Sequence, residues 1–216
     1  MAPPMGYASQ FAIGSADPVD QRMRFTTENF QAQRQQLPED EITGSASADL
    51  ATVRYGPMSY VGSVTLRPNA VEWSYLLPWI LGGTPSGTTY PLADTLMEKY
   101  FAFDRVTRAF LYSGGVVGRA TLNCDPVNKL SVTLDLFATA ENAAYSFPTL
   151  SLSSTTKPFV LTDSVIAVNS VTVCTTSIQV VIDNVLTPDD LTNCSVGPTS
   201  YIRSGPRDNR ARRRGH

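Results

Sequence analysis

The sequence predicts a mainly β protein of the α+β class: an antiparallel β-sandwich or barrel-like subunit with one flanking helix at about residues 69–81 and an extended N-terminal arm and loops. Several short stretches alternate apolar and polar residues, which is typical of half-buried strands. Turn signals separate successive stretches, so the strands are expected to join as antiparallel hairpins. The 216 residues are enough for one domain with a real core plus ordered arms.

Residues 1–58 are expected to form an N-terminal arm and loop region. The stretch "MRFTTENF" could hold a short strand, and "LPEDEITGSASAD" is expected to be an exposed loop. Because the periodicity is weak over so many residues, we expect this region to become ordered on a partner chain.

Residues 59–186 are expected to form the β-sandwich core with its helix. The stretch "YVGSVTL" predicts a strand, which Pro68 and Asn69 convert into a helix that Asn69 can cap. Pro78 removes one helical hydrogen bond, so the last turn is expected to be distorted or broken. Gly82 and Gly83 supply the stop.

This helix carries more apolar surface than one packed face requires. Leu76 and Ile80 form a row that is expected to pack on the sandwich of the same chain. Trp73, Tyr75 and Trp79 fall on more than one helix face, so part of this aromatic set predicts an interface with another subunit. The apolar run is far shorter than the about 20 residues of a membrane-spanning helix, so membrane insertion is not expected.

The strands that follow are expected to alternate with turns. "KYFAFDRVTRAFLYSG" predicts two strands around Asp104–Thr107, and "GVVGRATLNC" and "KLSVTLDLFATA" predict two strands joined at "DPVN". "ENAAYSFPTLSLSSTTKP" is expected to be a longer connection, and "VLTDSVIAVNSVTV" and "TSIQVVIDNVL" supply the last strands. Within "KLSVTLDLFATA" the leucines and Val132 face one way, and the opposite face holds Ser131, Thr133 and Asp135.

Residues 187–216 are expected to form a basic C-terminal extension. From Arg203 to His216 there are six arginines and one acid, a net charge of +5, whereas the rest of the chain has 11 basic and 18 acidic residues, a net charge of −7. The extension is either a solvated end or a contact for phosphate or an acidic neighbour.

The chemistry of an enzyme is missing from the sequence. The one histidine is the terminal His216, which argues against Ser-His-Asp and Cys-His catalysis. The three cysteines lack metal-ligand spacing, and the chain has neither a phosphate-binding Gly-Lys-Ser/Thr loop nor a dinucleotide fingerprint. We therefore expect no catalytic, cofactor-binding or metal site and no cofactor. The opening residues lack a secretory signal, so synthesis in a cytosol is expected.

An ordered set of stretches carries a resemblance to a known family. "SADPVDQRMRFTTENFQAQRQ", "YVGSVTLRPNAVEWSYLLPWILGGT" and "YPLADTLMEKYFAFDR" are followed by "FPTLSLSS", "KPFVLTDSVIAVN" and "IQVVIDNVL". Over roughly residues 15–186 the chain resembles the tail tube, or major tail, proteins of long-tailed bacteriophages of the siphovirus type. The chain ends sooner after "IDN" than family members often do.

The resemblance implies a structural virion protein of the phage tail, made in the cytoplasm of the host bacterium. Family members are β-sandwich subunits flanked by a helix, and six form a ring whose inner strands join into one β-barrel. Rings stack around a tape-measure protein, meet tail terminator and tip proteins, and form a conduit for viral DNA during genome ejection. The resemblance implies no enzymatic activity.

Two questions of orientation and function stay open at this level. Within the family picture, Ser131, Thr133 and Asp135 are lumen-facing candidates, although the same polar face could lie on the tube exterior. The lumen is expected to be polar and not strongly positive, because a basic bore would hold phosphates. The alternative function is a monomeric β-sandwich module for binding or adhesion on a virion.

Overall fold

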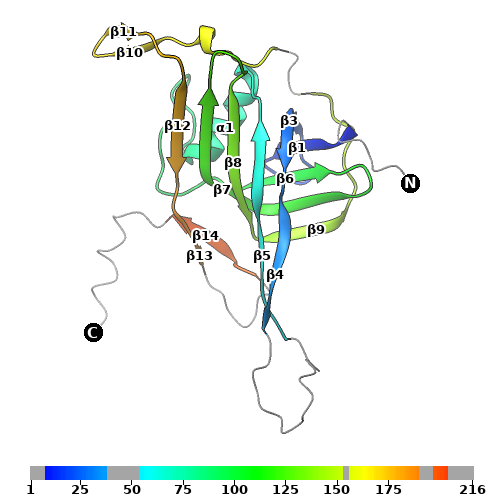
Figure 1. Cartoon of the computed structure of the whole chain (residues 1–216). Helices are drawn as coiled ribbons and strands as arrows, with labels where there is room; N and C mark the ends of the chain where they lie inside the picture. The colour runs from blue at the N-terminus through cyan, green and yellow to red at the C-terminus, as the bar shows by residue number, and fades with distance from the viewer. Residues whose placement is uncertain (1–7, 38–53, 153–155, 190–196, 204–216) are drawn as a thin grey trace, which may run out of the picture.

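A computed structural model describes residues 8–37, 54–152, 156–189 and 197–203. The described residues form two antiparallel sheets that share a strand, with a single α-helix behind one of them (Figure 1). The sheets face each other across the core and do not close into a barrel. The expected fold class, a mainly β sandwich with one flanking helix, is confirmed.

The first sheet has the strand order β2-β1-β6-β7-β9. Its strands are β1 (Gln10–Gly14), β2 (Gln21–Met23), β6 (Lys99–Asp104), β9 (Ala140–Tyr145) and the first half of β7 (Ala109–Cys124). The second sheet combines the remainder of β7 with β5 (Arg54–Leu66), β8 (Ser131–Ala138) and β12 (Ile178–Asp183) in the order β12-β7-β8-β5. β3 (Phe25–Glu28) and β4 (Gln31–Leu37) pair with successive parts of β5.

β7 is one strand where the sequence predicts two. The pattern suggested a break between "FLYSG" and "GVVGR", but the strand continues through Gly114, whose φ of 59° only glycine adopts at little cost. β7 pairs with β9 up to Ser113 and with β6 up to Gly115, and beyond these residues it pairs with β8 and β12. The glycine therefore turns the strand from one sheet into the other.

Shorter elements complete the described chain. β10 (Ile166–Val168) and β11 (Val171–Val173) form one hairpin, β13 (Leu186–Asp189) and β14 (Ser200–Arg203) form another, and η2 (Leu161–Asp163) is a short 3-10 turn. β9, β13 and β14 lie where the sequence predicted no strand. Nearly all of the arginine-rich end falls outside the described residues, as does most of the expected loop "LPEDEITGSASAD". The boundaries 1–58, 59–186 and 187–216 remain a prediction.

The N-terminal region supplies part of the core. Phe11 and Ile13 on β1 are fully buried, and Phe30, between β3 and β4, is 1 % exposed. Phe30 packs against Phe101 and Tyr112 with ring centroids 5.0 and 4.5 Å apart. This differs from the expectation of an arm that needs a partner chain to become ordered. The sequence pattern was weak because β1, β2 and β3 are too short to give a clear period and β4 is exposed along its whole length.

Helix α1 (Ala70–Leu81) has the ends that the sequence predicts. The Asn69 side chain accepts hydrogen bonds from the first turn, the Glu72 carboxylate accepts one from the Asn69 backbone N–H, and Gly82 ends the helix at a φ of 83°. Of the two expected outcomes for the last turn, distorted or broken, the broken one is wrong, because the helix continues through Pro78 to Leu81. No helix of the described chain is long and apolar enough to span a membrane.

Two buried polar side chains fasten α1 to the shared strand. The indole Nε1 of Trp79 donates to the carbonyl of Gly115 at 2.8 Å. Asn184, just after β12, donates through Nδ2 to the carbonyls of Ile80 at 2.9 Å and Val117 at 2.8 Å. Leu76 and Ile80 are fully buried in the main core, as expected from their row on the helix.

Gly62 lets the chain between β3 and β4 cross β5 in close contact. A Cβ at Gly62 would lie 2.4 Å from the Cα of Phe30 and 2.8 Å from its nitrogen. The side chain of Asn29 also accepts hydrogen bonds from the backbone and hydroxyl of Ser63, at 2.5 and 3.1 Å. Because the obstacle is backbone, no change of rotamer would make room for a methyl group.

We expect Gly62→Ala to lower the free energy of unfolding by about 1–3 kcal/mol, the usual cost of overpacking. Urea unfolding followed by circular dichroism measures the change. Gly56→Ala in the same strand is the control, because the nearest atom to its Cβ would be the Gln35 Cβ at 3.3 Å, and the nearest backbone atom the Gln35 oxygen at 3.6 Å. Equal effects of the two substitutions would contradict the close-contact account.

Candidate functional site

The front of the second sheet is a polar face opposite the core. Along β8 buried and partly exposed residues alternate, with Val132, Leu134 and Leu136 fully buried. Ser131, Thr133 and Asp135 lie between them and are partly exposed. The prediction that these three residues share the face away from the core is confirmed. Whether the face borders a tube lumen remains a prediction.

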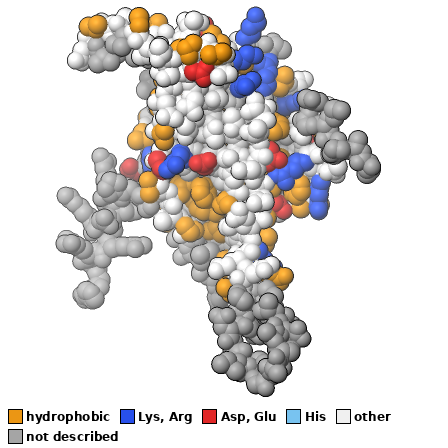
Figure 2. Space-filling model, viewed as in Figure 1, with side chains coloured by type: hydrophobic (Ala, Val, Ile, Leu, Met, Phe, Trp, Pro, Cys, Tyr) orange, Lys and Arg blue, Asp and Glu red, His pale blue; other side chains and the backbone are white. Residues whose placement is uncertain are grey.

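The polar face continues across the neighbouring strands. Thr133 lies between Thr65 of β5 and Thr121 of β7 in the register, and its hydroxyl lies 3.1 Å from that of Thr65. Asp135 lies between Ser63 and Arg119. In Figure 2 the upper part of the surface over β12, β7, β8 and β5 is mainly white, the colour of uncharged polar side chains and backbone, and orange hydrophobic side chains gather below the row of charges. Phe137, the next outward residue of β8, is also partly exposed. The upper part of the polar face is therefore largely hydroxyl and amide surface.

A few charges cross the polar face and nearly cancel. Arg119 donates to Asp183 of the edge strand β12 at 2.7 Å, and Asp135 lies on the other side of Arg119. The hydrogen bond from Arg119 holds the pKa of Asp183 below its usual range. This exposed pair adds little stability. With two acids and one base, these three residues give the face a slight negative charge.

The second sheet ends in edges that pair on one side only among the described residues. β12 pairs with β7 alone, and β3 and β4 pair with β5 alone. Val180 and Val181 of β12 are 43 % and 53 % exposed. An open edge with exposed β-branched residues is a surface on which another strand can pair, so isolated proteins usually block such edges.

The aromatic residues of α1 divide into two groups. Trp79 has no exposed surface, so it has none to offer another subunit in this conformation of the chain. Trp73 and Tyr75 are half-buried and pack against the main core from its rim. The structure thus leaves Trp73 and Tyr75 as interface candidates and assigns Trp79 to the core. The ring packs in the apolar core, and its hydrogen bond to Gly115 satisfies the indole N–H there.

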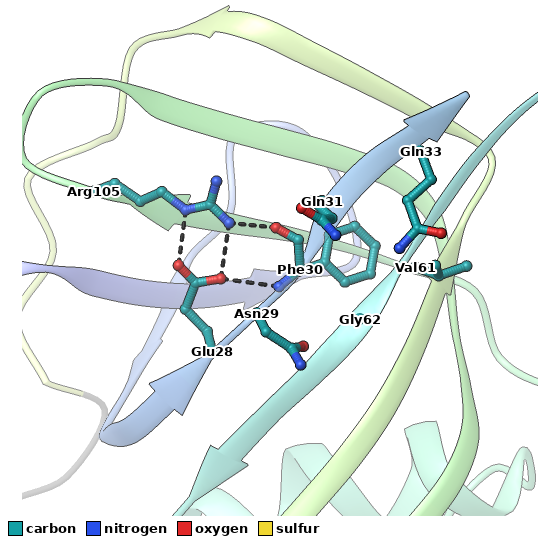
Figure 3. A pocket seen from close by; sticks show the side chains of 8 residues that line it. All are labelled: Glu28, Asn29, Phe30, Gln31, Gln33, Val61, Gly62 and Arg105. Atoms are coloured by element: carbon teal, nitrogen blue, oxygen red, sulfur yellow. Dashed lines mark hydrogen bonds and ion pairs between the residues drawn. The ribbon is translucent and has the colours of Figure 1, made fainter. Parts of the chain in front are cut away.

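An open hollow of about 340 Å³ lies where the chain passes from β3 to β4 (Figure 3). Arg105 forms a bidentate ion pair with Glu28, with both N–O distances 2.8 Å, and also donates to the carbonyl of Phe30. Burial acts to lower the pKa of Arg105, but the hydrogen bonds and charge of Glu28 outweigh it, so the pKa rises. This pair fixes the crossing from the side opposite Gly62.

Sequence reasoning missed these polar contacts. Glu28 and Arg105 are 77 residues apart, and Asn184 is 104 residues from Ile80. No local pattern marks such partners, because each residue is ordinary in its own stretch. Among the described residues no group of three or more His, Cys, Asp or Glu side chains could hold a metal ion.

We expect Arg105→Ala to lower the free energy of unfolding by about 2 kcal/mol, because Glu28 would keep its half-buried charge without two charge-assisted hydrogen bonds. Urea unfolding measures this loss. Arg119→Ala removes the exposed pair on the polar face and is the control, which should leave the unfolding midpoint unchanged. A larger loss for Arg119→Ala than for Arg105→Ala would contradict this ranking.

Comparison with known proteins identifies the family to which this chain belongs. Residues 4–210 match a family described as phage tail tube protein. A search of curated proteins finds no match. The family match spans nearly the whole chain, including both sheets, the helix and the polar face. The chain belongs to the phage tail tube protein family, a family of structural proteins of the virion tail.

Proposed function

We propose that this protein assembles into rings, hexameric as the resemblance implies, which stack into the tube that conducts viral DNA. The polar face of the second sheet carries the proposal, since it would line the bore. Its hydroxyl and amide groups tolerate water, and its slight negative charge would not hold phosphates in transit. The tube would enclose a tape-measure protein before ejection, and its two ends would meet the terminator and tip proteins.

The open sheet edges support ring closure. A sheet that is repeated around an axis removes its edges when each copy meets the next, and a closed barrel is the limiting case. The second sheet has suitable edges at β12 and at β3 and β4. The core and α1 lie behind the sheet, which leaves the polar face free to point toward the axis.

The direction of the polar face can be tested by labelling Ser131→Cys with maleimides in a Cys174→Ser, Cys194→Ser background. In the unassembled subunit both a small and a polymer-linked maleimide should react, because Ser131 is partly exposed. In assembled tubes only the small reagent should enter the bore and react. Mass spectrometry measures the labelled fraction.

Equal reaction of the polymer-linked reagent with tubes and subunits would place the face on the exterior and contradict the proposal. Val165→Cys, at a residue that is 82 % exposed outside the polar face, reports the general accessibility of tubes. A wild-type chain that stays monomeric under all assembly conditions would instead favour a binding or adhesion module.

Trp73 and Tyr75 are the part of α1 that we propose for contact with an adjacent subunit. The chain has two tryptophans, and Trp79 is already fully buried. Assembly should therefore shift the tryptophan emission to shorter wavelength through Trp73 alone. Trp73→Phe should abolish the shift, and Tyr75→Ala should lower the yield of assembled protein. A shift that persists in Trp73→Phe would exclude Trp73 from the interface.

A further inference from the structure

A basic hollow lies at one end of the second sheet. Its volume is about 440 Å³, and its lining contains four cationic side chains and no acid: Arg24, Arg67, Lys129 and Lys157, with Phe25, Thr26 and Pro158. Figure 2 shows Lys and Arg side chains gathered at the upper end of the molecule, where β5 ends in Figure 1. We call this group of residues the basic hollow.

The fold brings these cations together from distant parts of the sequence. Phe25 pairs with Leu66, which pairs with Val132, so Arg24, Arg67 and Lys129 lie near the same end of adjacent strands. The segment that contains Lys157 is tied across this end. Arg24 donates to the carbonyl of Thr156 at 3.0 Å, and the backbone of Leu130 donates to that of Phe159 at 2.8 Å.

Three cations of the basic hollow form no ion pair within the described chain. Arg67, Lys129 and Lys157 are exposed, and the ion pairs of the described residues do not include them. These three like charges around one hollow repel one another, and a bound acidic group would relieve this repulsion. The chemistry of the hollow therefore calls for an acidic occupant.

The same chain carries an acidic segment at the opposite end of this sheet. Residues 38–53 contain Glu39, Asp40, Glu41 and Asp49 and no basic residue. The segment joins β4 to β5 at the point where Leu37 pairs with Arg54, and this end of the hairpin projects away from the sandwich in Figure 1.

Glu39, Asp40 and Glu41 of the acidic segment cannot reach the basic hollow of their own chain. β5 runs 13 residues from Arg54 to Leu66, which is about 40 Å at roughly 3.3 Å per residue. Glu39, Asp40 and Glu41 follow Leu37 by at most four residues, a reach of about 15 Å. A contact between the two must therefore join two molecules.

We propose that the basic hollow binds the acidic segment 38–53 of a second copy of this chain. Such a contact is head to tail, because it joins the two opposite ends of the same sheet. A head-to-tail contact leaves a free hollow at one end and a free segment at the other, so it repeats without limit and builds an open stack. As the contact between successive rings, it rests on the proposed function.

The test exchanges the two charges. Arg67→Glu, Lys129→Glu and Lys157→Glu change the charge of the hollow from +4 to −2, and Glu39→Lys, Asp40→Lys and Glu41→Lys change that of the segment from −4 to +2. Each set should reduce the yield of sedimentable tubes at least tenfold, whereas the six substitutions in one chain should restore it. Mixing the two purified variants should also restore tubes, because both contacts between unlike variants then join opposite charges.

Wild-type yield from the hollow variant, or no rescue in the combined chain despite a native circular dichroism spectrum, would overturn the inference. The control for net charge compares two single substitutions, Lys157→Glu in the hollow and Arg108→Glu at an exposed residue outside it, which change the net charge by the same amount.

A second measurement keeps the inference separate from tube formation. A fluorescent peptide of residues 38–53 is titrated onto the full chain at low and high salt, with anisotropy as the readout. Binding should weaken at least tenfold in Lys129→Glu, Lys157→Glu and at high salt. If wild-type forms no tubes yet binds the peptide, only the proposed function fails. No peptide binding, or binding of a short DNA oligonucleotide in its place, would refute the hollow as a site for the segment.

Discussion

β7 pairs with four strands, and its two halves belong to different sheets. This sharing requires the strand to turn at Gly114, where its pairing with β6 shifts register, and the positive φ of that glycine allows the turn. The turn brings the apolar faces of both sheets onto one core, while Trp79 and Asn184 fasten α1 to β7 just beyond it. The back of the second sheet is thereby fully covered.

The same constraint leaves the front of that sheet uncovered. Because side chains alternate along β8, a strand with one side in the core must present Ser131, Thr133 and Asp135 on the other. The sheet also ends in one-sided edges, and its two strand ends differ in charge. A basic hollow lies at one end, and an acidic segment is attached at the other. A subunit of a tube needs a polar face for the bore, two sheet edges for its neighbours in the ring and two ends of opposite charge for the next rings. An isolated binding module does not need all of these features.

The sequence predicted the parts of this structure that local rules determine. The Asn69 cap, the Gly82 stop and the alternation along β8 each depend on a few consecutive residues, and all are confirmed. Sequence reasoning failed where distant residues decide. Pro78 continues the helix instead of breaking it, in a helix that Trp79 and Asn184 hold against β7. β7 crosses a glycine pair because four strands pair with it.

The candidate surfaces show the same division. The polar face followed from alternation, whereas the burial of Trp79 depends on Gly115, which comes 36 residues later. The basic hollow had no local signal, because its four cations come from separate stretches that are brought together by the register of β3, β5 and β8. The acidic segment was visible as a loop, but its meaning depends on which end of the sheet it leaves.

A cryo-electron microscopy reconstruction of the assembled protein tests the central claim most directly. The account predicts stacked rings in which Ser131, Thr133 and Asp135 of every subunit border the bore, with the core and α1 behind them. A reconstruction with these residues on the outer surface and α1 toward the axis would contradict it.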